Sequence, residues 1–484
     1  MIAWAQNFVV LVPEVLLLYG ALSILLLGVF YKGEYAGRAA GLTAIFLVFG
    51  IVAVLNQQPE IPREALFFGM YTANAFTQFV KVVLLASVLA AVCLSVRYFK
   101  AEDERPFEFY VLMILATIGM GMMVSANHLL TLYIGLEMQS LALYVLAALR
   151  RKDGLAIEAG LKYFILGALA SALLLFGTSF LYGATGSLGY DGIAVALGES
   201  GSLSLPAVVG LVFILAGFAF KVSAAPFHMW TPDVYQGAPT NVTAFFAVAP
   251  KVAALAALIK FLVVPLHVGI EDGRQILLLL AVASMVVGAF GALRSESFKR
   301  LMAYSTINHM GYILLAVAMV TKVSVAAVLM YLVVYAVTSV GLFALALRVV
   351  RGNVYSDKLS DWAGLARQHP GMALCGAVFL LSLAGIPPMA GFFAKLFVFE
   401  AIVEKGFIGF AVAGVIASVV AAYYYLRLCK VMYFDDAPEG RVLLPVKILT
   451  GISVGAALMV LGFLAVPEPL LVLAREAAEA LFNF

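Results

Sequence analysis

LVFILAGFAFKVSAAPFHMW at residues 211–230 and LLSLAGIPPMAGFFAKLFVFE at residues 380–400 are two apolar stretches that proline interrupts. Each also carries a lysine near its proline, the residues concerned being Lys221, Pro226, Pro387, Pro388 and Lys395. Proline breaks helical hydrogen bonds, and freed backbone groups are tolerated at membrane depth only where protein or a hydrated cavity satisfies them. The pattern therefore predicts two broken membrane helices, each with a titratable group near its break.

The composition around these stretches is that of an integral membrane protein. Of 484 residues, 64% are hydrophobic and 12% are charged, whereas soluble domains average roughly 45–50% apolar and about 25% charged residues. This excludes a soluble enzyme, a nucleic-acid binder and a disulfide scaffold. The three cysteines stand apart from one another, and metal or iron–sulfur sites need clustered ligands. We expect no metal site, redox centre or bound cofactor in this chain, and no nucleic-acid partner.

Apolar runs separated by short polar segments predict an all-α fold with fourteen transmembrane helices. The N-terminus lacks the features of a signal peptide and is interpreted as part of the first span, and the longest polar stretch, 184–204, is too short for a domain. The predicted spans are 8–30, 38–55, 75–96, 108–125, 128–149, 159–183, 205–227, 239–264, 274–293, 299–320, 324–347, 371–404, 407–428 and 446–470.

The two proline breaks fall in the seventh and twelfth spans, five helices apart. An odd repeat length places two copies in opposite orientations, and interrupted helices in corresponding positions are typical of such inverted repeats. We therefore expect accessory helices in 1–107, a first five-helix repeat in 108–264, a second, inverted repeat in 274–433 and a last helix in 434–484.

The loop cations predict the orientation in the membrane. Nineteen lysines and arginines fall in loops after odd-numbered spans, against five in loops after even-numbered spans and in the C-terminal tail. Because positively charged loops stay on the cytoplasmic side, both termini are predicted outside.

When cations in the first or last two residues of a span are counted with the adjoining loop, six cations remain inside the predicted spans, and all six are lysines. A lysine near the bilayer centre costs roughly 2.5–3.5 kcal/mol on insertion scales, and burial can make a lysine alternate between charged and neutral forms, which arginine cannot do. The set favours proton handling over anion binding. The alternative for each is a side chain that reaches the interface, favoured for Lys81 and Lys260, open for Lys162, and disfavoured for Lys221, Lys251 and Lys395.

Glu137 is the only acidic residue deep within a predicted span. A lone carboxylate at this depth needs a partner, and Lys221 or Lys162 is the expected one. His228, two residues after Pro226, and His309, in the middle of 299–320, are candidate proton relays because histidine titrates near neutrality. A packing role is equally open for each histidine.

The segment KVSAAPFHMWTPDVYQGAPTNVTAFFAVAPKVAAL, residues 221–255, closely resembles the signature of the antiporter-like membrane subunits of respiratory complex I. These subunits are related to multisubunit sodium/proton antiporters. Within that group, PFHMWTPDVYQGAPT (226–240), VPEVLLLYGALSILLLG (12–28) and LSDWAGLARQHPGMALCGAVFLLSLAGIPPMAGFFAKL (359–396) are similar to subunit N. Asn241, where the family pattern has proline, departs from it without touching a titratable group.

The resemblance implies a polar axis in the middle of the membrane. It matches Glu137 and Lys221 to an interacting pair, Lys251 to a central lysine and Lys395 to the lysine of the twelfth helix. It also implies polar roles at Lys162 and His228. Lys395 argues against subunit M, which has glutamate there, and the absence of a long lateral helix after about residue 470 argues against subunit L.

The function implied is that of a proton-translocating subunit of NADH:quinone oxidoreductase in the bacterial inner membrane. NADH, FMN, iron–sulfur clusters and quinone are then expected in other subunits, with subunit M and the small subunits J and K as neighbours. A subunit of a multisubunit sodium/proton antiporter without redox coupling is the main alternative. A scaffold with a vestigial channel is a third.

Overall fold

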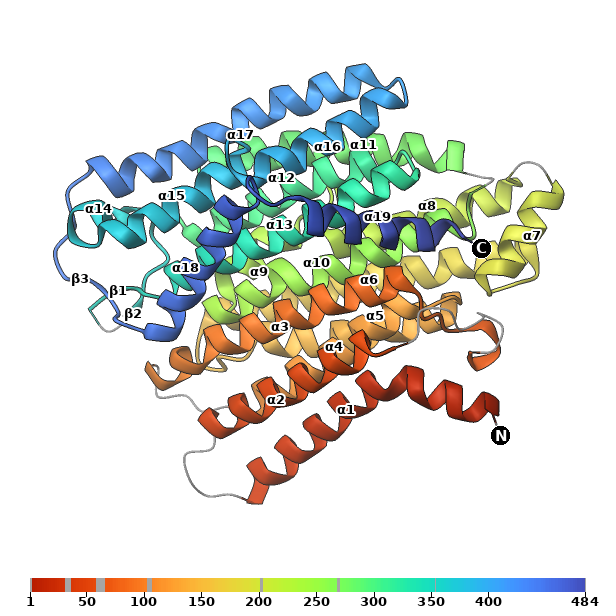
Figure 1. The fold of residues 1–484 in the computed structure, drawn as a ribbon, viewed down its shortest axis with the longest axis horizontal. Coiled ribbons are helices and arrows are strands. Elements are labelled where there is room, and N and C mark those ends of the chain that lie inside the picture. The colour runs from red at the N-terminus through yellow and green to blue at the C-terminus, as the bar shows by residue number, and fades with distance from the viewer. Residues whose placement is uncertain are drawn as a thin grey trace.

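The computed structural model describes residues 2–30, 36–57, 66–101, 107–200, 203–267, 270–352 and 354–483. The fold is nearly all-helical, and most helices run along one common direction (Figure 1). Both termini lie at one end of this bundle, and the short strands lie at the other. Three loop cations used to predict orientation, Lys32, Arg63 and Arg105, fall outside the described residues.

The helices follow the predicted spans closely because their apolar runs end at polar or glycine-containing segments. Eleven helices of the described part are long and apolar enough to cross a membrane. The helices are α1 (Ile2–Phe30), α2 (Ala36–Leu55), α3 (Ala75–Ala101), α4 (Phe107–Ser125), α5 (Leu129–Ala147), α6 (Gly154–Thr185), α7 (Tyr190–Ser200), α8 (Leu205–Val222), α9 (Trp230–Gly237), α10 (Thr240–Val263), α11 (Ile270–Leu293), α12 (Phe298–Val317), α13 (Lys322–Ala346), α14 (Leu365–Gln368), α15 (Pro370–Ala384), α16 (Ala390–Glu404), α17 (Ile408–Phe434), α18 (Lys447–Gly462) and α19 (Glu468–Phe482), with 3₁₀ turns at Phe67–Gly69 and Leu359–Trp362.

Helical structure stops at both predicted proline breaks. The helical run from residue 205 ends at Val222 and resumes at Trp230, and the run from residue 370 ends at Ala384 and resumes at Ala390. These two interruptions create the candidate site described below.

Helices α7, α9 and α14 lie where no span was predicted, and α19 lies almost wholly beyond the last predicted span. The polar stretch 184–204 contains α7, which buries Tyr190, Ile193 and Leu197 along one face. The last span was predicted to continue to residue 470, but α18 ends at Gly462 and a separate helix, α19, follows. The last span is therefore eight residues shorter at its end than predicted, and a 15-residue helix follows it.

The buried face of α19 explains why this segment is helical. Ala474, Ala477, Ala478 and Leu481 are buried at helical spacing, and α19 packs against α3 and α13. Residues three and four apart share one helix face, so a short helix forms where that face meets the bundle.

A small sheet also departs from the all-α prediction. Strands β1 (Val349–Arg351), β2 (Val354–Tyr355) and β3 (Arg441–Leu443) form an antiparallel sheet in the order β2-β1-β3. Val350 pairs with Tyr355 on one side and with Val442 on the other. The sheet joins the loops after α13 and α17 at the bundle end opposite the termini.

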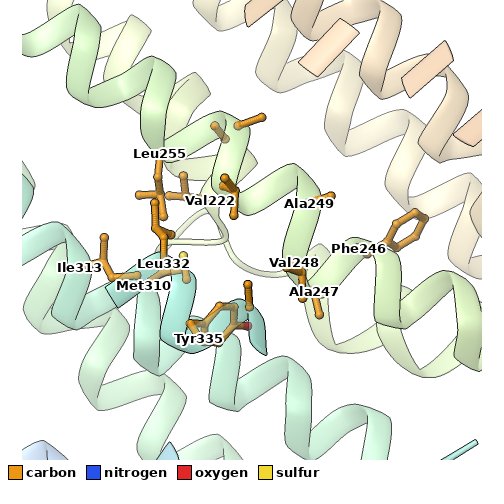
Figure 2. Packing of buried hydrophobic residues seen from close by; sticks show 14 of the residues in the cluster. Val222, Phe246, Ala247, Val248, Ala249, Leu255, Met310, Ile313, Leu332 and Tyr335 are labelled. Atoms are coloured by element: carbon orange, nitrogen blue, oxygen red, sulfur yellow. The ribbon is translucent and has the colours of Figure 1, made fainter. Parts of the chain in front are cut away.

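The transmembrane helices pack closely through small residues and apolar side chains. A Cβ at Gly119 of α4 would lie 2.6 Å from the Gly135 carbonyl oxygen of α5, so glycine is required at this crossing, as in other membrane helix pairs. Helix α10 is buried along its whole length. Figure 2 shows apolar side chains of α10, such as Leu255, gathered with Met310 of α12 and Leu332 of α13.

Candidate functional site

The first break places two backbone carbonyls in the interior of the bundle. Ser223, the residue after α8, has a left-handed conformation with φ 67°. The Phe220 carbonyl, which has lost its usual helical partner, accepts hydrogen bonds from Ser223 N at 3.1 Å and from the Trp230 indole nitrogen at 3.0 Å. Side chains therefore satisfy backbone groups that the interrupted helix leaves open, as membrane burial requires.

Lys251 of α10 occupies this break. Its Nζ donates to the Lys221 carbonyl oxygen at 3.0 Å and to Ser223 Oγ, and it lies 4.7 Å from the centre of the Trp230 ring. Only 1% of the residue is exposed. Its partners are thus neutral oxygens and an aromatic face, and among the described residues no carboxylate oxygen lies within 4.0 Å of this nitrogen.

The second break is built in the same way around Lys395. Gly385, after α15, is also left-handed, with φ 80°. Lys395 Nζ donates to the Ala384 carbonyl oxygen at 2.9 Å and to Ser418 Oγ at 2.8 Å, and lies 4.8 Å from the centre of the Tyr312 ring. Both lysines therefore bind a carbonyl freed by a helix break, a serine hydroxyl and an aromatic ring.

Lys221 is buried, but it makes no direct ion pair. Its Nζ donates to Ser140 Oγ at 2.6 Å and lies 3.5 Å from the Tyr144 hydroxyl. Glu137, one turn before Ser140, is near enough to act on Lys221 through space. The Glu137 Oε1 atom is buried and has no hydrogen-bond partner among the described residues. The expected direct contact between Glu137 and Lys221 is not present, because Ser140 occupies the position next to the ammonium.

Lys162, the other expected partner of Glu137, belongs to an ion-pair network nearer the surface. Its Nζ lies 2.7 Å from Asp233 Oδ2 and 2.7 Å from Glu158 Oε1. Asp233 also pairs with Arg300 at 3.0 Å. About two-fifths of the Lys162 side chain, 41%, is exposed, so the structure does not bring this lysine into the buried group of Lys221 and Lys251.

The two histidines have different surroundings. His228, in the break between α8 and α9, is half-buried, and its Nδ1 has no hydrogen-bond partner in the described part of the chain. His309 of α12 is buried between two tyrosine hydroxyls, with Nδ1 2.7 Å from Tyr331 and Nε2 3.0 Å from Tyr425. The Tyr425 hydroxyl continues to Ser305 Oγ at 2.6 Å.

A small cavity lies between the hydrogen-bonded group around His309 and the break between α15 and α16. Its volume is about 10 Å³, the order of magnitude needed for one water molecule. It is lined by polar groups of α12, α13 and α15, namely His309, Tyr331, Tyr335, Thr338 and Ser382. Sequence reasoning missed these tyrosines and hydroxyls, because single hydroxyl groups within apolar helices carry no signal of their own.

The interpretation of Lys81 and Lys260 as side chains that reach the interface was wrong. Lys81 is 3% exposed and Lys260 is 2% exposed. Lys81 forms an ion pair with Glu14 at 2.6 Å, and Lys260 donates to Thr72 Oγ1. Their positions near predicted span ends are enclosed by neighbouring helices, which sequence position alone does not reveal. Over the described ranges, the histidines, cysteines and carboxylates form no group of three that would hold a metal ion.

A helical membrane bundle with a lysine bound at each of two helix breaks is the arrangement that the resemblance to antiporter-like membrane subunits implies. The family described as "NADH:quinone oxidoreductase/Mrp antiporter, TM" matches residues 126–421. Within this class, NADH-quinone oxidoreductase subunit N of Parvibaculum lavamentivorans is 47% identical over 480 residues, covering 99% of both chains. The chain belongs to the subunit N family of NADH-quinone oxidoreductase.

Solved structures agree with this assignment. A chain of respiratory complex I from Thermus thermophilus with bound aureothin is 34% identical, with a TM-score of 0.82, and the match covers 96% of this chain and 99% of that one. A chain of the Mrp complex from Dietzia sp. has the same TM-score, 0.82, at 20% identity over 98% of both chains. The second likeness shows a shared fold alone.

Proposed function

We propose that this chain is a proton-translocating membrane subunit of NADH:quinone oxidoreductase. The observation that carries the proposal is the pair of buried lysines at the two helix breaks, Lys251 and Lys395. Each ammonium is bound by neutral oxygens and an aromatic ring. Such a lysine can lose and regain a proton without leaving a carboxylate unpaired, and cation–π contact supports the charged form when it is present.

The route follows from the order of the polar groups. A proton loads Lys251 at the first break, passes to the tyrosine-bound His309, and reaches Lys395 at the second break. Apolar side chains of α10, α12 and α13 meet between these helices (Figure 2), so transfer across them depends on water entering this interface. In this scheme His228 and Lys162 lie on the path by which protons reach Lys251, and not on the path from Lys251 to Lys395.

Glu137 acts as an electrostatic switch on Lys221 in this scheme. Its carboxylate has an unpaired buried oxygen, while Lys221 is held by Ser140. A shift of Glu137 by one rotamer changes its distance from Lys221 without breaking an existing ion pair. The backbone carbonyl of Lys221 also binds the Lys251 ammonium, so a change in the charge of Lys221 acts on the central lysine from an adjacent residue.

The architecture proposed is fourteen transmembrane helices, with inverted repeats in 108–264 and 274–433. The like design of the two breaks supports the repeat. Both termini lie at the bundle end opposite the small sheet (Figure 1), which supports their placement on one side of the bacterial inner membrane. The loop cations favour the periplasmic side for both. Subunits M, J and K are the proposed neighbours. The redox groups, NADH, FMN, iron–sulfur clusters and quinone, are assigned to other subunits, which supply the driving energy.

A lysine-to-methionine comparison in the complete complex tests the proposal. Lys251→Met removes the central ammonium at nearly constant volume, and Lys405→Met, at the exposed end of α16, is the matched control. Membrane vesicles are assayed for NADH:quinone turnover and proton pumping together. We expect at least a tenfold loss of both activities for Lys251→Met in an assembled complex, and normal values for Lys405→Met.

The proposal is wrong if Lys251→Met pumps and oxidises NADH normally, which would favour a scaffold. Pumping that requires sodium and persists without NADH oxidation would instead favour the sodium/proton antiporter.

A further inference from the structure

The N-terminal helices contain a buried ion pair that the proposed proton route does not use. Lys81 Nζ of α3 lies 2.6 Å from Glu14 Oε1 of α1 and 2.9 Å from the Tyr71 hydroxyl, which donates to the same Glu14 oxygen at 2.9 Å. The three residues are 3%, 7% and 4% exposed, respectively. We call Glu14, Tyr71 and Lys81 the N-terminal triad.

Extended backbone connects the N-terminal triad to α10. Thr72 N donates to the Ser125 carbonyl at 2.8 Å and Asn127 N donates to the Met70 carbonyl at 3.0 Å. Successive side chains of extended backbone point to opposite sides. Tyr71 therefore points towards Glu14 and Lys81, while Thr72 accepts a hydrogen bond from Lys260 of α10.

Buried polar atoms without partners surround this connection. Among the described residues, Glu14 Oε2, Ser125 Oγ and Asn127 Oδ1 have no hydrogen-bond partner, although the three residues are at most 7% exposed. The Ser125 hydroxyl lies close to the Tyr71 hydroxyl. Buried polar atoms are almost always bonded to protein or to water. A purely structural ion pair gives no reason for three such atoms at one place.

The same group of residues reaches the surface. Asn127 Nδ2 donates to Asp191 Oδ2 at 3.0 Å and to the Gly69 carbonyl at 3.0 Å. Asp191 is exposed and begins α7, which lies at the bundle end that carries both termini (Figure 1). Polar groups of the paired segments 70–72 and 125–127 thus lie between the N-terminal triad and the exposed Asp191 at this end.

We propose that the N-terminal triad is a second, hydrated proton-exchange site that opens at the end of the bundle carrying the termini. Its role as a port for translocated protons rests on the proposed function. A proton arriving through water binds the Glu14 carboxylate and forms an O–H bond. The same bond breaks when the proton leaves to water beside Asn127 and Asp191.

The experiment combines a spectroscopic readout with a transport readout on the whole complex. Infrared difference spectra record the protonated carboxyl band of Glu14, identified by its loss in Glu14→Gln, and its exchange in heavy water. Vesicles containing Glu14→Gln/Lys81→Met, which removes both charges, are assayed for protons pumped per NADH oxidised. Asp191→Asn, a surface change that leaves the pair intact, tests the opening, and Glu108→Gln, an exposed carboxylate of α4, is the control.

We expect an exchangeable Glu14 band, slower exchange in Asp191→Asn, fewer protons per NADH in the double variant, and no change in Glu108→Gln. The inference is overturned if the Glu14 carboxyl does not exchange, or if the double variant pumps normally, and either result would leave a structural ion pair. Lys251→Met separates the two proposals. If that variant pumps normally, the proposed function fails, while the infrared result still decides the N-terminal triad. If the double variant does not assemble, Glu14→Gln spectra and Asp191→Asn exchange decide alone.

Discussion

Gly391 offers a sharp test of whether the geometry of the second break controls proton transfer. It lies in the first turn of α16 and faces Ser382 of α15, whose hydroxyl accepts a hydrogen bond from the Gly391 backbone nitrogen at 3.1 Å. A Cβ at this position would lie 1.9 Å from the Ser382 carbonyl oxygen. Gly391→Ala must therefore push α15 and α16 apart.

The required movement can be estimated from the contact. Real Cβ atoms essentially never approach closer than 3.0 Å, so the two helices must separate by about 1.1 Å at this point. Lys395 follows one turn later on α16 and binds the Ala384 carbonyl of α15 at 2.9 Å. A shift of this size stretches that hydrogen bond to about 4 Å, beyond hydrogen-bond range. Overpacking of this kind costs typically about 1–3 kcal/mol.

The assay is proton pumping per NADH oxidised, with thermal unfolding of the purified complex measured in parallel. We expect Gly391→Ala to assemble, to unfold at lower temperature and to lose most of its pumping. Gly409→Ala in α17 is the matched control, because a Cβ there meets nothing within 4 Å. Wild-type pumping and stability in Gly391→Ala would refute the reasoning, since they would show that the break tolerates separation of its two helices.

Two further predictions concern stability. Lys81→Met leaves the Glu14 carboxylate buried without its cation, so the free energy of unfolding of the complex should fall by about 3–5 kcal/mol in thermal unfolding experiments. The double variant Lys81→Met/Glu14→Leu should recover most of this loss. Equal stability of the single and double variants would contradict the prediction. His128 caps α5 by accepting a hydrogen bond from Leu130 N through Nδ1, and partial burial lowers the pKa of His128 below its usual value. The unfolded chain therefore binds this proton more readily, so the cap's contribution of about 1 kcal/mol is present above about pH 6.5 and is lost as the pH falls. His128→Asn should remove this pH dependence in unfolding experiments between pH 8 and 5, and an unchanged dependence would assign it to other groups.

The sequence predicted the membrane helices and both breaks because these features depend on local composition. An apolar run of about 20 residues has few alternatives in a bilayer, and proline acts on its own turn. The short helices α7 and α19 were not predicted, because contacts with other helices of the bundle stabilise them. Leu197 and Leu481 mark their buried faces, and neither face is apparent until the neighbouring helices are in place.

The candidate site was predictable only in part for the same reason. The lysines at the breaks stand out as charges within apolar runs. Their partners carry no such signal, because Ser418 and Tyr312 come close to Lys395 only when α17 and α12 pack with α16. The ion pair between Glu14 and Lys81 joins residues 67 positions apart, so position along a span gave the wrong environment for Lys81.

Helix α10 shows why the two lysine environments must be kept separate. Lys251 and Lys260 are nine residues apart, about 2.5 helical turns, so they point from opposite faces of α10. One face meets the break between α8 and α9, where the ammonium binds neutral oxygens. The other meets Thr72 beside the N-terminal triad. A helix that carries an ammonium on two faces cannot turn either face to lipid without a large cost, which accounts for the complete burial of α10.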